Sequence, residues 1–189
     1  MADWNWQGYE NRTLNVVVYS SCDEVELFLN GKSLGKKKTD RDAKYLASYE
    51  VPYAAGELKA VGYTKNKKVQ ESFLKTAGSP TDLVLTAEKT MLHANNQDLT
   101  YINVEVKDDK GITNPKTELP VQFSVEGAGT IAGVGNANPA SVESCHSNTR
   151  KTWKGKCLLI VKAGKERGDI KITATAGNIK TKELVIKVD

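Results

Sequence analysis

The stretch Asp23–Lys38, DEVELFLNGKSLGKKK, decides how this chain folds. Apolar and polar residues alternate along its first half, so every second side chain can face a core while its neighbours face water. Asn30 and Gly31 follow directly, and this pair is a strong hairpin signal because a type I′ turn requires positive φ at both positions. The stretch therefore predicts a β-hairpin with one buried face.

The same period of two continues on both sides of this hairpin. We predict strands in the first part of the chain near residues 12–20, 24–30, 33–37, 44–51, 56–64 and 67–76. Turn-forming residues at Gly56 and at Lys65-Asn66 separate the later strands. No window of a dozen residues sustains the spacing of an amphipathic helix, so we expect almost no helix.

Small and turn-forming residues from Thr76 to Thr81 indicate a linker, since Pro80 cannot donate to a sheet ladder. Alternation resumes after it. The apolar positions of the further strands are Leu83, Leu85, Ala87, Ile102, Val104, Val106, Val121, Phe123, Val125, Leu158, Ile160, Ile170, Ile172, Leu184, Ile186 and Val188. Many short strands with turns between them predict an all-β chain of two tandem antiparallel sandwiches, residues 1–78 and 79–189. Glycines and asparagines interrupt the second one, which predicts a long loop at 127–155.

The composition is that of a chain that can build cores. Of 189 residues, 39% are hydrophobic and 26% are charged. No apolar run approaches the roughly 20 residues that span a bilayer, and the start of the chain lacks a signal-peptide pattern. We therefore expect either a cytoplasmic protein or an excised part of a larger, targeted one, with no membrane insertion.

The net charge of +4 is mild. Lysines cluster at Lys36–Lys38 and again at Lys65, Lys67 and Lys68, and no aromatic residues interleave them to stack on bases. We interpret both clusters as solvated turns or as a lysine-guarded edge strand, and we predict no nucleic-acid partner.

Residues that could carry chemistry are few. Cys22, Cys145 and Cys157 match neither a disulfide framework nor a metal motif; we expect free thiols, with a Cys145–Cys157 bridge as the alternative. Glu143 and His146 have a spacing that brings metal ligands together on a helix, but they fall in a predicted loop. We predict no catalytic residue, no metal site and no cofactor.

The first part of the chain resembles the immunoglobulin-like module that follows the catalytic barrel in many family 2 glycoside hydrolases of the β-galactosidase type. The matching residues are Trp4, Trp6, Asp23, Val25, Glu26, Leu27, Leu29, Asn30, Gly31, Ser33, Leu34 and Gly35. The second part is similar to the further C-terminal immunoglobulin-like domain of these enzymes. There the matching residues are Gly133 to Pro139, Ser141, Glu143, Arg150, Trp153, Gly155 and Cys157. The chain departs from the family pattern at Asp3, Ala137 and Cys145.

The resemblance implies two tandem immunoglobulin-like sandwiches without catalytic residues. In such enzymes the catalytic carboxylates lie upstream, on an α/β barrel of roughly 250 residues that is not in this sequence. It implies a non-catalytic C-terminal fragment that supports and docks to the upstream catalytic barrel. The parent is then expected to hydrolyse O-glycosidic bonds in carbohydrate metabolism, to be periplasmic or extracellular, and to come from a Bacteroidetes-type polysaccharide degrader.

Two groups of side chains are candidates for contacts with a partner. The first, at the start of the chain, consists of Trp4, Trp6 and Tyr9. We expect it to be exposed and to dock on the catalytic barrel, since large aromatic side chains are typical of interfaces, although they can also stack on sugars. The second group, around the predicted loop, consists of Asn136, Asn138, Arg150 and Trp153. It is a possible sugar site. A carbohydrate-binding module and a protein-interaction or adhesion module are therefore the alternatives.

Overall fold

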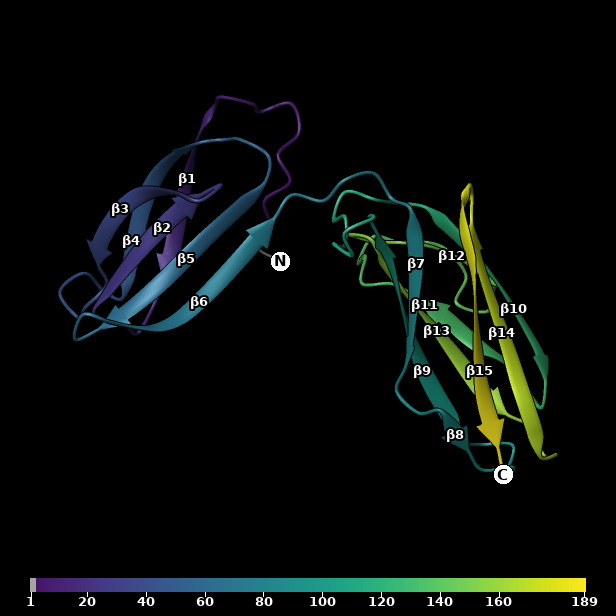
Figure 1. Ribbon diagram of the computed structural model, residues 1–189. Helices are drawn as coiled ribbons and strands as arrows, with labels where there is room; N and C mark the ends of the chain where they lie inside the picture. Colours follow the sequence, from purple (N-terminus) through teal and green to yellow (C-terminus); the bar gives the residue numbers. More distant parts are fainter. Residues whose placement is uncertain (1–2) are drawn as a thin grey trace. The chain divides into compact units, whose positions relative to one another are not determined.

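The structure, a computed structural model, describes residues 3–189 and, at Lys180, only the backbone (Figure 1). The described chain forms fifteen β-strands and no helix, which confirms the all-β prediction. Accordingly, these residues include no helix long and apolar enough to cross a membrane. The chain divides into two compact units, residues 1–76 and 77–189.

Hydrogen bonds account for the position of this division, which falls just before the boundary expected at 78/79. Thr76 Oγ1 donates to Trp4 O (2.5 Å) and accepts from Gly56 N (3.1 Å), so Thr76 belongs to the first unit. Gly78 N donates to Asp108 Oδ2 (2.8 Å), so Gly78 belongs to the second.

The first unit is a sandwich of two unequal sheets. A four-stranded sheet has the order β3-β2-β5-β6, and a two-stranded sheet, which lies behind it in Figure 1, pairs β1 with β4. The strands are β1 (Thr13–Tyr19), β2 (Glu24–Leu29), β3 (Lys32–Lys38), β4 (Leu46–Pro52), β5 (Glu57–Thr64) and β6 (Lys67–Lys75). Each lies within two residues of a predicted strand. The core consists of Trp4, Leu27, Ala47, Tyr49, Val51, Tyr53 and Leu58.

The hairpin predicted at Asn30-Gly31 is confirmed. Both residues have positive φ, 49° and 81°, as a type I′ turn requires. The Asn30 side chain also reaches the turn between β4 and β5, where Oδ1 accepts from Glu57 N (2.8 Å) and Nδ2 donates to Ala55 O (3.0 Å). One amide therefore ties two turns together and satisfies backbone groups that no strand partner satisfies.

The second unit is a larger sandwich. One sheet has the order β12-β10-β14-β15-β8 and the other β11-β13-β9-β7; all pairs are antiparallel except β15 with β8. The strands are β7 (Asp82–Ala87), β8 (Met91–Leu92), β9 (Leu99–Lys107), β10 (Pro120–Gly127), β11 (Gly129–Gly135), β12 (Thr149–Lys151), β13 (Lys156–Ala163), β14 (Gly168–Ala176) and β15 (Ile179–Val188). Predicted apolar positions of β9, β10 and β14, such as Ile102, Phe123 and Ile172, fill the core between the sheets.

Two expectations for the second unit need correction. In β13 the buried face carries Leu159 and Val161, whereas the predicted Leu158 and Ile160 are only half-buried. The side chains on both faces of this strand are apolar, so alternation alone could not predict which face is buried. The loop predicted at 127–155 is also shorter, residues 136–148, because β11 and β12 extend the sheets into the predicted range.

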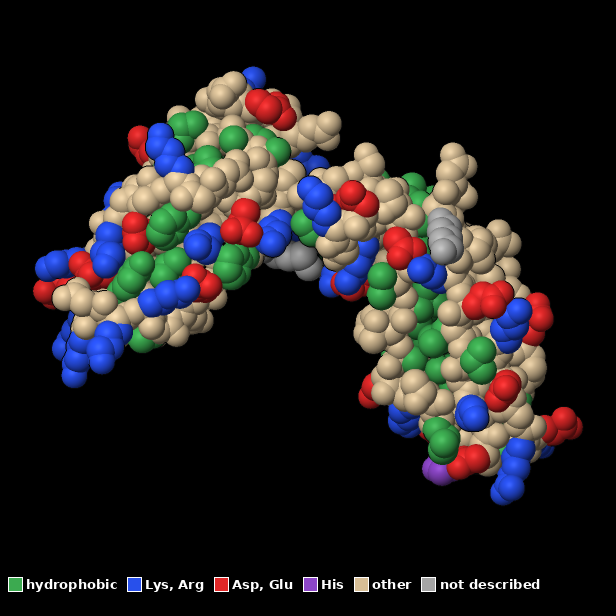
Figure 2. Space-filling view, viewed as in Figure 1, with side chains coloured by type: hydrophobic (Ala, Val, Ile, Leu, Met, Phe, Trp, Pro, Cys, Tyr) green, Lys and Arg blue, Asp and Glu red, His purple; other side chains and the backbone are tan. Residues whose placement is uncertain are grey.

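The lysine cluster at Lys36–Lys38 lies on β3, an edge of the four-stranded sheet, as the interpretation of a guarded edge predicts. Lys36 Nζ lies 3.7 Å from the centroid of the Tyr63 ring. Lys37 Nζ donates to Ser48 O (2.6 Å) and so joins β3 to β4. Figure 2 shows acidic side chains mixed with the basic ones over the visible face of this unit.

The link between the two turns can be tested at Gly56. A Cβ at this position would lie 1.9 Å from Asn30 Oδ1, at a φ of 134°. We expect Gly56→Ala to lower the free energy of unfolding of the first unit by about 2–4 kcal/mol. Gly31→Ala is the matched control, since its φ is 81° but its Cβ meets nothing within 4 Å; it should cost only about 1–2 kcal/mol. Urea unfolding followed by Trp fluorescence in a Trp153→Phe background reports this unit alone, and equal costs for both variants would contradict the link.

Candidate functional site

The first candidate group lies in the segment that leads into β1. Tyr9 N donates to Trp6 O (2.9 Å) and Arg12 N donates to Tyr9 O (2.9 Å), so the backbone turns twice. The rings of Trp6 and Tyr9 meet edge to face with centroids 5.8 Å apart, and the Arg12 guanidinium carbon lies 5.1 Å from the Tyr9 ring centroid. We call residues 6–12 the aromatic turn.

A buried tyrosine holds the aromatic turn in place. Tyr53 Oη accepts from Trp6 N (3.2 Å), and the Tyr53 carbonyl accepts from Asn11 N (3.0 Å). The side chains of Trp6 and Tyr9 nevertheless remain 41% and 42% exposed. The turn therefore presents two aromatic rings and one cation to solvent on a fixed backbone, which is the chemistry of an interface anchor.

Trp4 is not part of this exposed surface, and the expectation that it is exposed is wrong. Its side chain is only 2% exposed, its Nε1 donates to Ala54 O (2.9 Å), and its ring packs edge-on against Tyr53 at 5.1 Å. The indole belongs to the buried cluster of the first unit, together with Tyr49, Val51 and Leu58. The residue is a core side chain of its own sandwich.

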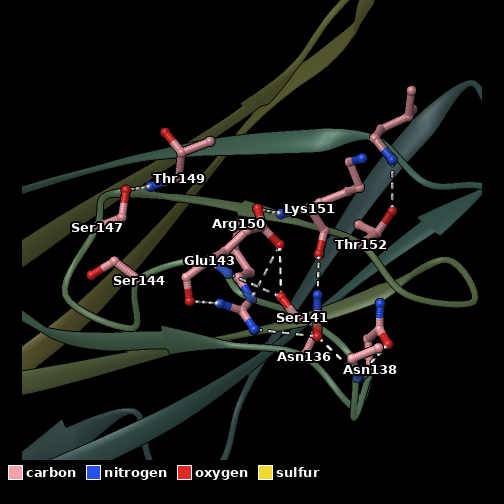
Figure 3. A network of polar contacts seen from close by, with 12 residues as sticks. Asn136, Asn138, Ser141, Glu143, Ser144, Ser147, Thr149, Arg150, Lys151 and Thr152 are labelled. Carbon is pink, nitrogen blue, oxygen red and sulfur yellow. Dashed lines mark hydrogen bonds and ion pairs between the residues drawn. The ribbon is translucent and has the colours of Figure 1, made fainter.

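The second candidate group centres on Arg150 in β12 (Figure 3). This arginine is 4% exposed. Its Nη1 donates to Glu143 O (3.0 Å), its Nη2 donates to Asn136 Oδ1 (3.3 Å), and its Nε lies 3.8 Å from Glu143 Oε2. The guanidinium thus binds the first residue and the middle of the 136–148 loop, and the loop folds over it.

Asn136 and Asn138 also form hydrogen bonds to backbone groups in and beside the loop. Asn136 Nδ2 donates to Lys151 O (2.7 Å), while its Oδ1 accepts from Asn138 N (3.0 Å) as well as from Arg150. The Oδ1 of Asn138 accepts from Ala140 N (3.0 Å). The hydrogen bonds of Arg150 and of the Asn136 amide therefore build the loop.

Trp153 stands apart from this network. Its backbone N donates to Lys156 O (2.7 Å) in a tight turn, and Lys154 Nζ lies 5.8 Å from its half-buried ring. Among the described residues, no hydrogen bond or ring contact joins it to Arg150. The structure therefore brings together Asn136, Asn138 and Arg150, but it does not add the predicted stacking residue to them.

The described side chains include no group of three His, Cys, Asp or Glu residues that could hold a metal ion. All three cysteines are free thiols; Cys22 and Cys157 are buried, and Cys145 is exposed. Burial raises the pKa of the Cys157 thiol to about 12, so this group is neutral at physiological pH and a poor nucleophile.

Sequence reasoning missed Tyr53 and Arg12, which complete the aromatic turn. Tyr53 continues the alternation of Tyr49 and Val51 beyond the predicted strand end, and this signal could have marked it as a core residue. No sequence pattern marks Arg12, because its contact with Tyr9 depends on the turn geometry.

Fold and sites together define a β-sandwich protein of two units. Its polar networks hold loops in place, and the aromatic turn exposes Trp6 and Tyr9. The family comparisons agree with this class. A family described as glycoside hydrolase family 2 C-terminal domain 5 matches residues 83–185, and a domain of unknown function matches residues 11–70. The chain belongs to the glycoside hydrolase family 2 C-terminal domain family.

Individual relatives extend the match to nearly the whole chain. The β-galactosidase BoGH2A of Bacteroides ovatus is 37% identical over 186 residues, which cover 98% of this chain and 22% of that protein. A β-glucuronidase of Formosa agariphila is 25% identical over 93% of this chain and 17% of its own length. The crystal structure of a glycosyl hydrolase family 2 member from Bacteroides cellulosilyticus superposes with a TM-score of 0.96 and 46% identity, covering 99% of this chain and 24% of that one.

The chain thus spans only about a quarter or less of the length of these relatives. It corresponds to a C-terminal accessory part of the family 2 enzymes, outside their catalytic region, as the resemblance implied. This place in the relatives associates it with the catalytic domain of the same polypeptide.

The role of Arg150 as the centre of the loop predicts a large effect of its removal. Arg150→Ala leaves Glu143 O without its donor and Asn136 Oδ1 with only Asn138 N, and we expect the second unit to lose about 2–4 kcal/mol of stability. The loop should then be cleaved after Glu143 by a glutamate-specific protease many times faster. Arg167→Ala, which removes an exposed arginine of the same unit, is the control. An unchanged cleavage rate in Arg150→Ala would show that the network does not hold the loop.

The burial of two cysteines predicts selective alkylation. At pH 8 iodoacetamide should label Cys145 in the folded chain and spare Cys157, whose pKa of about 12 keeps the thiol protonated. After denaturation all three cysteines should react. Intact mass and peptide mapping distinguish these states, and a native adduct on Cys157 would contradict its placement in the core.

Proposed function

We propose that this chain is a docking and support module of a family 2 glycoside hydrolase that cleaves β-glycosidic bonds, with β-galactosides as the first substrate class to examine. The observation that carries the proposal is the aromatic turn, which exposes Trp6 and Tyr9 on a backbone fixed by Tyr53. Exposed aromatic anchors beside a cation are the residues that dominate binding at protein interfaces.

The relatives support the class of reaction and leave two sugars open. One is a β-galactosidase and another a β-glucuronidase, and the β-galactosidase is the more similar of the two. Because the chain covers only the C-terminal part of both, its contribution to their chemistry is positional. It supports the catalytic domain and does not supply the carboxylates that cleave the bond.

A carbohydrate-binding role is the second candidate, and the same turn is its only structural support among the described residues. Sugars stack best on a broad, flat aromatic face. The rings of Trp6 and Tyr9 are inclined at 72°, so they do not form one continuous plane. This geometry favours insertion of the turn into a protein surface over stacking on an oligosaccharide.

The proposal is tested in the complete family 2 polypeptide that carries this chain. We expect the complete enzyme to hydrolyse chromogenic aryl β-galactoside or β-glucuronide and the chain alone to hydrolyse neither. Replacing Trp6 and Tyr9 together by serine should weaken docking by about 2 kcal/mol or more. In calorimetry this region should then unfold in a separate, earlier transition, while hydrolysis at 25 °C keeps its rate constant.

Tyr101→Ser is the matched control, because Tyr101 is 40% exposed but lies on β9 of the second unit. It should leave the calorimetric profile unchanged. Hydrolysis by the chain alone would overturn the accessory role. Tight binding of an oligosaccharide that the double variant loses, with no change in unfolding, would favour the carbohydrate-binding role instead.

A further inference from the structure

One long side of the first unit is open between β1 and β6. Two cavities lie along it, with volumes of about 310 Å³ and about 220 Å³. The larger, at the start of β1, is lined largely by apolar side chains, among them Trp6, Leu14, Leu58 and Leu74. The smaller, at the end of β1, has a more polar lining that includes Val18, Gly62, Gln70 and Ser72. We call this open side the β1 groove.

The opposite side of the same sandwich is closed. Lys37 Nζ donates to Ser48 O (2.6 Å), which joins β3 to β4, and Tyr49 Oη donates to Val25 O (2.7 Å), which joins β4 to β2. The two-stranded sheet is thus drawn toward β2 and β3. It leaves the inner faces of β5 and β6 without a complete cover, and the groove is the resulting gap.

The strand that borders the gap has a free edge. Ser20 N donates to Tyr45 O (3.0 Å) and Tyr53 N donates to Arg12 O (2.9 Å), so the even-numbered residues of this register form the hydrogen bonds to β4. The backbone groups of the odd-numbered residues therefore point away from β4. These residues are Thr13, Asn15, Val17 and Tyr19.

This edge lacks the features that normally prevent strand pairing. Its seven residues, TLNVVVY, include no charge, no proline and no glycine. Val17 is 39% and Tyr19 is 78% exposed. The other two edges that belong to the larger sheet, β3 and β6, both carry several lysines. A long, uncharged edge strand is a template for another strand, and natural proteins leave such an edge only where it is to be covered.

We propose that β1 accepts an extended strand from the remainder of the family 2 polypeptide, which adds a third strand to the β1–β4 sheet and fills the β1 groove. This deepens the proposed docking function and rests on it. The incoming segment is uncharged along the edge. It carries apolar side chains over Leu58 and Leu74 and small or polar ones over Gly62 and Ser72. Main-chain hydrogen bonds supply affinity, and alternate side chains supply specificity.

The size of the groove indicates a tethered partner. Stable interfaces between separate proteins use about 20–30 residues on each side, and one seven-residue edge offers far less. A segment of the same polypeptide needs less contact, because tethering supplies an effective concentration on the order of millimolar. Trp6 of the aromatic turn also lines the larger cavity, so the groove continues the proposed docking surface.

A second copy of this chain fits the groove poorly. The cavities lie between β1 and residues of β6, such as Leu74 and Ser72, so β6 forms the floor on which an added strand rests. Another sandwich would bring its own β6 to the same place, and the two floors would compete for one space. A single extended segment has no such floor.

Amide hydrogen exchange tests the proposal with an internal control. In the chain alone, the amides of Asn15 and Val17 should exchange fast, while those of Val16 and Val18, which are bonded to β4, stay protected. In the complete enzyme, protection of Asn15 and Val17 should rise by roughly 100-fold or more, because their exchange then requires local opening. Exchange read by mass spectrometry with electron-transfer fragmentation resolves single amides.

A prolyl variant tests the edge itself. Val17→Pro removes an outward N–H, a change that edge strands tolerate, and in the complete enzyme it should return the Asn15 amide to the rate of the chain alone. Lys38→Pro is the control. Thr39 N donates to Asp23 O (2.9 Å), and hydrogen-bonding directions alternate along a strand. The N–H of Lys38 therefore points away from β2, at the β3 edge of the four-stranded sheet. It should leave Asn15 protected.

Each other result contradicts the proposal in a recognisable way. If the complete enzyme protects the aromatic turn but exchanges Asn15 and Val17 as fast as the chain alone, strand addition is wrong and the docking function stands. If no surface of this chain gains protection, both fail. If the same amides become protected in the chain alone as its concentration rises, and sedimentation shows a dimer, the occupant is a second copy.

Discussion

The first unit is governed by a mismatch in area: two strands must cover the inner face of four. A sheet that exposes its apolar face to water loses roughly 25 cal/mol for each Å² left uncovered, so the sandwich recruits side chains from outside the strands. Trp4, which precedes the first strand, lines the larger cavity and packs on Tyr53. That same tyrosine fixes the backbone of Trp6, and the aromatic turn is therefore a consequence of core packing. What the recruited residues do not fill remains as the β1 groove.

The same mismatch explains which parts of the molecule the sequence could predict. Alternation and turn chemistry are local, and they located every strand of the first unit and the turn at Asn30-Gly31. Burial in a gap is not local. The sequence pattern predicted an exposed Trp4, but its side chain is buried against Tyr53, a contact that forms only when the unit assembles. Both faces of β13 are apolar, so its own pattern cannot tell which of them is buried. The burial of Leu159 rather than Leu158 depends on the sheet that faces the strand.

The second candidate group, around Arg150, shows the same dependence on assembly. Asparagine, arginine and glycine in a loop are typical of ligand binding, but they are also what a long loop needs to satisfy its own backbone. Which use prevails depends on whether the guanidinium faces out or in, and Arg150 faces in, against Glu143 and Asn136. In the first unit the side-chain amide of Asn30 likewise forms hydrogen bonds to the backbone of a neighbouring turn. In both units, polar side chains such as Asn30 and Arg150 hold turns and loops in place.

Rigidity of this kind suits a module that acts by position. An interface gains from contacts that are ordered before binding, since each mobile side chain fixed on association costs roughly 0.5–1.5 kcal/mol. The aromatic turn is fixed by Tyr53, and the edge of β1 is fixed by its register with β4. Both belong to the first unit, and Trp6 connects them through the larger cavity. One continuous surface, with the exposed rings of Trp6 and Tyr9 at one end and an uncharged strand edge along its length, is therefore the part of this chain on which the proposed docking role rests.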